Sequence, residues 1–119
     1  MKRLQQQYSV EIVHDHAASG PTREVARLLG QQVRSGRIQR RWTVKELATR
    51  VGVSEVTMRK VERGDLSVAL GTALEAASVV GIELYGGADQ RAGELRRLAD
   101  TLALLPAAAR LPRTVDDDF

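Results

Sequence analysis

The feature that most constrains this chain is a pair of short helix signals separated by one glycine. Thr43 and Glu46 have the spacing of a capping box, in which each side chain bonds the other residue's backbone N–H at a helix start. Gly52 suits the left-handed backbone of a tight helix exit, and Ser54 supplies an N-cap two residues later. The apolar residues of both segments recur at helical spacing: Leu47, Ala48, Val51, Val53, Met58 and Val61. The pattern therefore predicts two short helices that share one core across a tight turn, the second of them ending at Gly64.

Helix signals also precede and follow this pair. Thr22 is a candidate N-cap directly after Pro21, and the apolar residues that follow it share one face of a helix. These residues are Val25, Ala26, Leu29 and Val33. Thr72 and Glu75 form a second capping box, which opens a helix that we expect to stop at Gly81. The positions of that helix expected to face inward are Leu74, Ala77 and Val80.

A last amphipathic helix is predicted from about Ala88 to Leu105, where Pro106 ends it. Its apolar stripe consists of Leu95, Leu98, Leu102 and Leu105. Only 3% of the residues are aromatic, and Leu, Val and Ala dominate the apolar set. This composition favours helices packed on helices, so we expect an all-α fold.

The two ends of the chain have weaker patterns. Tyr8, Val10 and Ile12 alternate with polar residues and could form one short strand, which needs a partner strand to be stable. The segment after Pro106 has no helical period and ends in an acidic run. We therefore divide the chain into an N-terminal arm (1–21), a helical domain (22–86), an amphipathic helix (87–106) and an acidic tail (107–119).

Several classes of protein are disfavoured by what the sequence lacks. It has no Cys and no apolar run of the roughly 18 residues that a membrane span needs. The first ten residues lack the apolar segment of a secretory signal, so we expect a cytoplasmic protein. His14 and His16 offer at most a weak pair of metal ligands, and we interpret them as solvated. No nucleotide-binding loop or nucleophile–base pair is evident, so we expect neither an enzyme nor a cofactor.

Basic residues are concentrated in the middle of the chain. Between Thr22 and Gly64 there are eleven Lys or Arg residues and four acids, whereas the rest of the chain is net acidic. A basic block of this kind indicates a polyanionic partner. The alternative is a solvated helix surface.

Two short helices joined by a three- or four-residue turn that contains Gly form the helix-turn-helix arrangement, which the segment Val44–Arg63 fits. The sequence from Val25 to Leu84 resembles the phage-repressor-like family of DNA-binding domains, the XRE or Cro/C1 type. The residues that carry the resemblance are Trp42-Thr43, Glu46-Leu47-Ala48, Gly52-Val53-Ser54, Thr57-Met58 and Val61-Glu62-Arg63-Gly64. The resemblance implies a five-helix lambda-repressor-like domain that places the second helix of the motif in the major groove of a double-stranded DNA operator. Val44 departs from the family, which usually has a phosphate-binding Gln there, so this contact is lost or supplied by Lys45.

The helix expected over residues 54–63 has two faces. Met58 and Val61 point toward the core, and the opposite face carries side chains that can read bases. Arg59 can bind the O6/N7 edge of guanine, Val56 a thymine methyl group, and Glu55 the N4 amino group of cytosine. We expect phosphate contacts from basic and hydroxyl side chains: Arg40, Arg41, Thr43, Lys45, Ser54, Lys60 and Arg63. The alternative for this whole set is a solvated helix face.

Arg37 is a charged residue on an apolar helix face, one turn beyond Val33, so its guanidinium group needs a partner. Glu62 lies at the edge of the buried face of the 54–63 helix. Pairing the two satisfies both, and the family resemblance implies such an internal Arg–Glu bridge. We therefore assign this pair a structural role.

Dimerisation is expected because one module of this kind contacts only part of one groove, and repressors resembling it bind two half-sites as dimers. The leucine stripe of residues 95–105 is a candidate for the homodimer contact, and packing on its own domain is the alternative. Residues 1–21 could also pair with their copy across a two-fold axis.

A second resemblance concerns residues outside the motif. The segments Glu62–Asp65, Ser67–Thr72, Leu104–Pro106 and Asp116–Phe119 look like those of HipB-type antitoxins, which repress the operon that they share with a HipA-like kinase toxin. Ala107–Ala109 depart from that pattern, in which basic residues are usual. The leading hypothesis is thus an operator-binding repressor, with an antitoxin role as its finer form. The rival is a protein-interaction module of the same fold that neutralises a partner protein without binding DNA, which Val44 and Glu55 favour.

Overall fold

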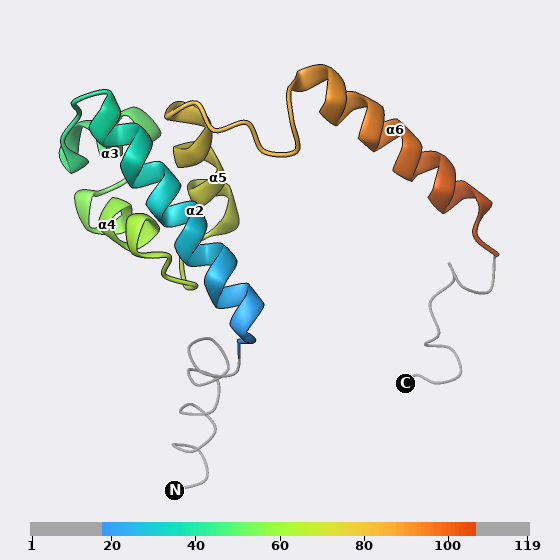
Figure 1. Cartoon of the computed structure of the whole chain (residues 1–119), viewed down its shortest axis with the longest axis horizontal. Helices are drawn as coiled ribbons and strands as arrows, with labels where there is room; N and C mark the ends of the chain where they lie inside the picture. The colour runs from blue at the N-terminus through green and yellow to red at the C-terminus, as the bar shows by residue number, and fades with distance from the viewer. Residues whose placement is uncertain (1–17, 107–119) are drawn as a thin grey trace, which may run out of the picture. The chain divides into compact units, whose positions relative to one another are not determined.

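The computed structural model describes residues 18–106, which hold five α-helices and no strand (Figure 1). The helices are α2 (Gly20–Gln39), α3 (Val44–Val51), α4 (Glu55–Arg63), α5 (Leu70–Val79) and α6 (Ala88–Leu104). The chain divides into two compact units, Met1–Glu83 and Leu84–Phe119, so α2 to α5 belong to the first and α6 to the second. The predicted all-α fold class is confirmed. The strand expected around Tyr8–Ile12, the pair His14 and His16, and the acidic tail lie outside the described residues.

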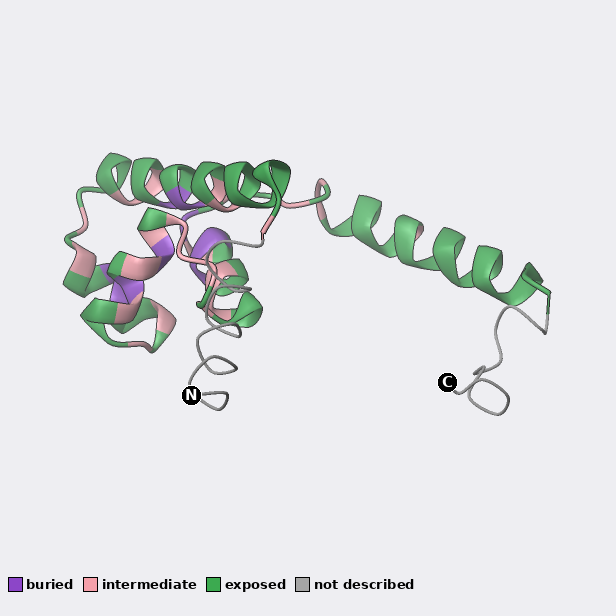
Figure 2. Ribbon diagram, turned by 90° about the horizontal axis from the view of Figure 1, so that it is seen from below, coloured by how far each residue is buried: buried purple, intermediate pink, exposed green. Residues whose placement is uncertain are grey.

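The first unit is held together by one apolar core to which its four described helices, α2 to α5, contribute. Helix α4 packs against α2, α3 and α5, and α5 also packs against α2 and α3. Leu47, Met58 and Val33 are the largest fully buried side chains. The other buried apolar residues are Ala48, Val61, Ala76, Ala77 and Val80. Figure 2 shows buried stretches (purple) within the helices of the first unit, next to exposed stretches (green).

Two glycines of α2 let other helices approach closely. A Cβ atom added to Gly30 would lie 2.6 Å from the backbone oxygen of Val61 in α4. A Cβ atom added to Gly36 would lie 2.9 Å from the Cβ of Val80, at the end of α5. Both distances are shorter than normal contacts, so no larger residue fits without moving a neighbouring helix. These glycines therefore fix how near α4 and α5 lie to α2.

The predicted starts and ends of the two motif helices are confirmed. Glu46 N donates to Thr43 Oγ1 at 3.0 Å and Thr43 N donates to Glu46 Oε1 at 2.7 Å, which completes the capping box. Thr57 N donates to Ser54 Oγ at 3.1 Å. Gly52 and Gly64 end their helices with φ of 89° and 75°, a left-handed conformation that favours glycine.

Two predicted helix starts are wrong. The N-cap of α2 is Ser19, not Thr22, since Thr22 N donates to Ser19 Oγ at 3.3 Å. The first turn of a helix tolerates proline, so α2 can begin before Pro21. Helix α5 begins at Leu70 without a side-chain cap, and Thr72 N already bonds the Ala69 carbonyl within the helix. Burial of Ala76 and Ala77 holds α5 in place, so a local capping pattern did not locate its first turn.

Some residues expected to face inward do not. Val25 is 64% exposed and Leu74 is 38% exposed, whereas Val33, Ala77 and Val80 are buried as predicted. In the second unit, α6 buries none of its residues, and Leu95 and Leu102 are 71% and 57% exposed. None of the helices in residues 18–106 combines the length and apolar character needed to cross a bilayer.

Candidate nucleic-acid interface

Helix α4 presents an outward face whose opposite side is locked into the core. Met58 and Val61 are buried, while Val56 is 65% exposed. Gly64 N and Asp65 N donate to the Val61 and Lys60 carbonyls, both at 3.0 Å, so the end of α4 is closed by backbone bonds. The outward positions are those predicted to meet DNA: Glu55, Val56, Arg59, Lys60 and Arg63.

The predicted principal base reader is paired with an acid in the free protein. Arg59 Nη2 donates to Glu55 Oε2 at 2.7 Å, one helical turn away, and the two side chains are 56% and 43% exposed. Solvent screens such an exposed pair, whose contribution to stability is small. The arginine is thus free to exchange its carboxylate partner for another acceptor.

Arg37 and Glu62 form a two-pronged ion pair between α2 and α4. Arg37 Nε donates to Glu62 Oε2 at 2.7 Å, and Nη2 donates to Oε1 at 3.1 Å. Only 12% and 8% of these side chains are exposed. The remaining terminal nitrogen, Nη1, donates to the Trp42 carbonyl at 2.9 Å, so one guanidinium group joins α2, α4 and the loop before α3.

The other predicted phosphate-binding residues fall on two neighbouring segments. Arg40, Arg41, Thr43 and Lys45 lie at the end of α2, in the loop and at the start of α3. Ser54, Lys60 and Arg63 lie at the cap and along α4. The hydroxyls of Thr43 and Ser54 already accept their helix-capping bonds, so a phosphate contact from either would add to a structural role. Arg41 has φ of 60°, which turns the chain sharply between α2 and α3.

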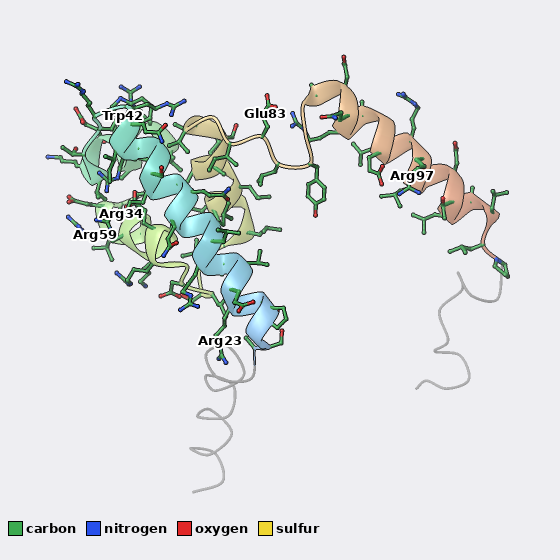
Figure 3. The ribbon with its side chains drawn as sticks, in the orientation of Figure 1. Arg23, Arg34, Trp42, Arg59, Glu83 and Arg97 are labelled. Carbon is green, nitrogen blue, oxygen red and sulfur yellow. The ribbon has the colours of Figure 1, made fainter. Side chains whose placement is uncertain are left out.

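Two basic residues near this surface were missed by the sequence reasoning. The Arg50 guanidinium carbon lies 4.1 Å from the centre of the Trp42 ring, a cation–π contact that braces the end of α3 against the loop. Arg34, labelled together with Arg59 in Figure 3, lines a hollow of about 270 Å³. The other residues of its lining are Arg37, Val44, Arg59, Glu62 and Arg63. The available signal was spacing, since Arg34 lies one helical turn before Arg37 on the same side of α2.

The loop after α4 holds an acid whose pKa is lowered. Ser67 Oγ and Ser67 N donate to Asp65 Oδ1 at 2.7 and 2.8 Å. These bonds, aided by the nearby charges of Lys60 and Arg63, hold the pKa of the Asp65 carboxyl below its ordinary value. Within residues 18–106, no group of three or more acidic or histidine side chains is placed to hold a metal ion.

A family model described as Helix-turn-helix (HTH_3) matches residues 33–86, from the middle of α2 to just beyond α5. The match spans both motif helices, the turn between them and the ion pair of Arg37 with Glu62. No curated protein and no solved structure matches the chain. The described helices are consistent with a lambda-repressor-like domain, and the match supports the XRE-type helix-turn-helix family. It also supports a DNA-binding regulator of transcription in general terms.

Proposed function

We propose that this chain is a sequence-specific repressor that places α4 in the major groove of a double-stranded DNA operator. The observation that carries the proposal is the division of α4 into a face locked in the core and an exposed face that bears Arg59, within a segment that matches the helix-turn-helix model. A helix fixed in this way can present base-reading side chains in a constant geometry.

The exposed side chains divide between reading and holding the DNA. Arg59 binds a guanine edge, with Val56 and Glu55 reading neighbouring bases. The residues proposed to hold phosphates are Arg40, Arg41, Thr43, Lys45, Ser54, Lys60 and Arg63. Val44 cannot make a hydrogen bond to a phosphate through its side chain, so Lys45 supplies the charge at the start of α3.

Selection of bound sequences from a random DNA pool tests this function directly. We expect the full chain to enrich one motif, and Arg59→Ala to bind DNA with that preference lost. Lys60→Ala is the comparison variant, which should weaken binding to every sequence by a similar factor. Failure of the full chain to retain any DNA at moderate salt would refute the proposal, while unchanged preference in Arg59→Ala would refute the reading role of that residue.

Repression from two half-sites requires a homodimer, and we propose that α6 supplies its contact. Leu98 and Leu102 lie one turn apart on the exposed apolar stripe of α6, at 44% and 57% exposure. Leu98→Glu with Leu102→Glu should make the chain monomeric in sedimentation experiments and lower its affinity for a two-half-site operator. The matched control is Arg96→Ala, which changes an exposed polar position of α6. A dimer that survives the double substitution would place the contact elsewhere.

The finer form of the proposal is an antitoxin that represses the operon it shares with a HipA-like kinase toxin. Its support is the HipB-like sequence around Asp65, whose carboxylate orders the loop at Ser67. Co-expression tests it: the chain should abolish the toxicity of the kinase encoded beside it and purify in a complex with that kinase. Absence of both effects would leave a repressor without an antitoxin role.

The second candidate is a protein-interaction module that neutralises its partner without binding DNA. The ion pair between Arg59 and Glu55 favours it, because it occupies the main base reader with an acid of the same face. A stable complex with a neighbouring protein, together with no retention of genomic DNA fragments at moderate salt, would establish this candidate over the repressor.

A further inference from the structure

A hollow of about 270 Å³ lies where α2, α4 and the start of α3 meet. Its lining consists of Arg34, Arg37, Val44, Arg59, Glu62 and Arg63. Four of these six residues are arginines and one is an acid. The hollow opens beside Arg59, the residue proposed to read a base, and Figure 3 shows Arg34 and Arg59 on the same side of the first unit.

The charges around the hollow do not balance. Both carboxylate oxygens of Glu62 accept hydrogen bonds from Arg37, so this acid and this arginine satisfy each other. Arg59 has Glu55 as its partner, but that pair is exposed and exchangeable. Among the described residues, no side-chain hydrogen bond or salt bridge engages the guanidinium of Arg34 or of Arg63.

Guanidinium groups that share one hollow repel each other unless an anion lies between them. Their planar, forked donors match the oxygens of a phosphate, to which they bind more strongly than to a neutral acceptor. Val44 adds an apolar wall without a competing acceptor. The arrangement thus has the chemistry of a phosphate site with two available ligands, Arg63 on α4 and Arg34 on α2, next to the base-reading Arg59.

We propose that this hollow receives one phosphate of the DNA backbone beside the base read by Arg59, and that Arg34 is its ligand from outside the two motif helices. The inference rests on the proposed DNA-binding function and deepens it. Arg34 then fixes α2 to the backbone while α4 enters the groove. Its contribution is independent of sequence, because a phosphate carries no base identity.

The test compares DNA affinity of the full chain and its Arg34→Ala variant over a range of salt concentrations. We expect Arg34→Ala to bind about tenfold more weakly to the selected operator and to an unrelated duplex alike. The slope of log affinity against log salt should fall by about 0.9, the value for one phosphate neutralised on a duplex. Arg34→Lys should retain the slope and lose only part of the affinity.

Controls separate this inference from the function on which it rests. Arg96→Ala removes the same charge from the second unit and should leave the salt slope unchanged. Circular dichroism and thermal melting check the fold of Arg34→Ala, which should be unchanged because the Arg34 side chain is exposed. Unchanged affinity and slope in Arg34→Ala, with the parent chain binding normally, would overturn the phosphate site alone. A parent chain that binds no DNA would overturn the function and the site together.

Discussion

Arg37 and Glu62 are separated by a whole helix and two turns in the sequence, yet their side chains meet through two hydrogen bonds of 2.7 and 3.1 Å. The pair is largely shielded from solvent. It holds α4 against α2 one helical turn beyond the buried core residue Met58. Because Arg37 also bonds the Trp42 carbonyl, the same residue sets the loop that leads into α3.

Removing one member of this pair should destabilise the protein. We expect Glu62→Ala to lower the free energy of unfolding by about 3 kcal/mol, because it leaves the Arg37 charge shielded and unpaired. Urea denaturation measures the change. The control is the double variant Arg37→Met with Glu62→Leu, which removes both charges and should recover most of the lost stability. A Glu62→Ala protein as stable as the parent would contradict the role assigned to the pair.

The crossing of α2 and α4 should not tolerate a methyl group at Gly30. Its Cβ would lie 2.6 Å from the Val61 oxygen, so one helix must move, and we expect Gly30→Ala to cost about 1–3 kcal/mol. Gly71→Ala is the matched control in α5, where nothing lies within 4 Å of the added atom. That variant should unfold at a higher urea concentration, because its free energy of unfolding rises by about 0.5–1 kcal/mol. The prediction fails if the two substitutions shift the midpoint in the same direction.

Neutralising Glu55 should strengthen sequence-independent DNA binding. Glu55→Gln removes an acid from the face proposed to meet DNA and frees the Arg59 guanidinium, and we expect about fivefold higher affinity for a duplex unrelated to the operator at low salt, roughly 1 kcal/mol. Fluorescence anisotropy with labelled duplexes measures it. Glu75→Gln changes an exposed acid of α5 and serves as the control for net charge. Equal gains in the two variants would mean that Glu55 has no local effect on the DNA.

Acid should weaken the fold in part through Asp65. The pKa of this carboxyl is lower in the folded state because Ser67 donates to it twice. Its contribution to stability is therefore complete above the unfolded pKa of about 3.9 and is lost as the pH falls through the lower folded value. Melting temperatures recorded from about pH 6 to pH 2 should fall less steeply for Asp65→Asn than for the parent. Parallel curves would show that the Ser67 bonds do not contribute.

Much of the first unit could be predicted from local sequence because the starts and ends of its motif helices depend on residues close together in the chain. The capping box at Thr43, the cap at Ser54 and the left-handed exit at Gly52 each depend on residues within one turn. The core positions Leu47, Met58 and Val61 followed from helical spacing, since the two motif helices share their buried faces.

Features that depend on contacts between distant segments could not be predicted in the same way. Helix α5 begins at Leu70 without a side-chain cap, and its buried residues Ala76 and Ala77 pack against other helices, so the capping pattern at Thr72 was misleading. Val25 continues the apolar period of α2, but none of the elements described in residues 18–106 covers it, and it is 64% exposed. The site residue Arg34 acquires its surroundings only when α4 packs against α2, which a reading of one helix at a time does not show.

The glycine at position 30 has a consequence for how such a protein changes its target. With the α2–α4 spacing fixed by a backbone contact, α4 has little freedom to tilt or slide, so new preferences must come from exchanging its outward side chains. Those side chains take no part in the core, so they can be exchanged without changing how α4 packs against α2. Engineering toward a new operator can therefore vary residues 55, 56 and 59 together and leave the remaining scaffold untouched.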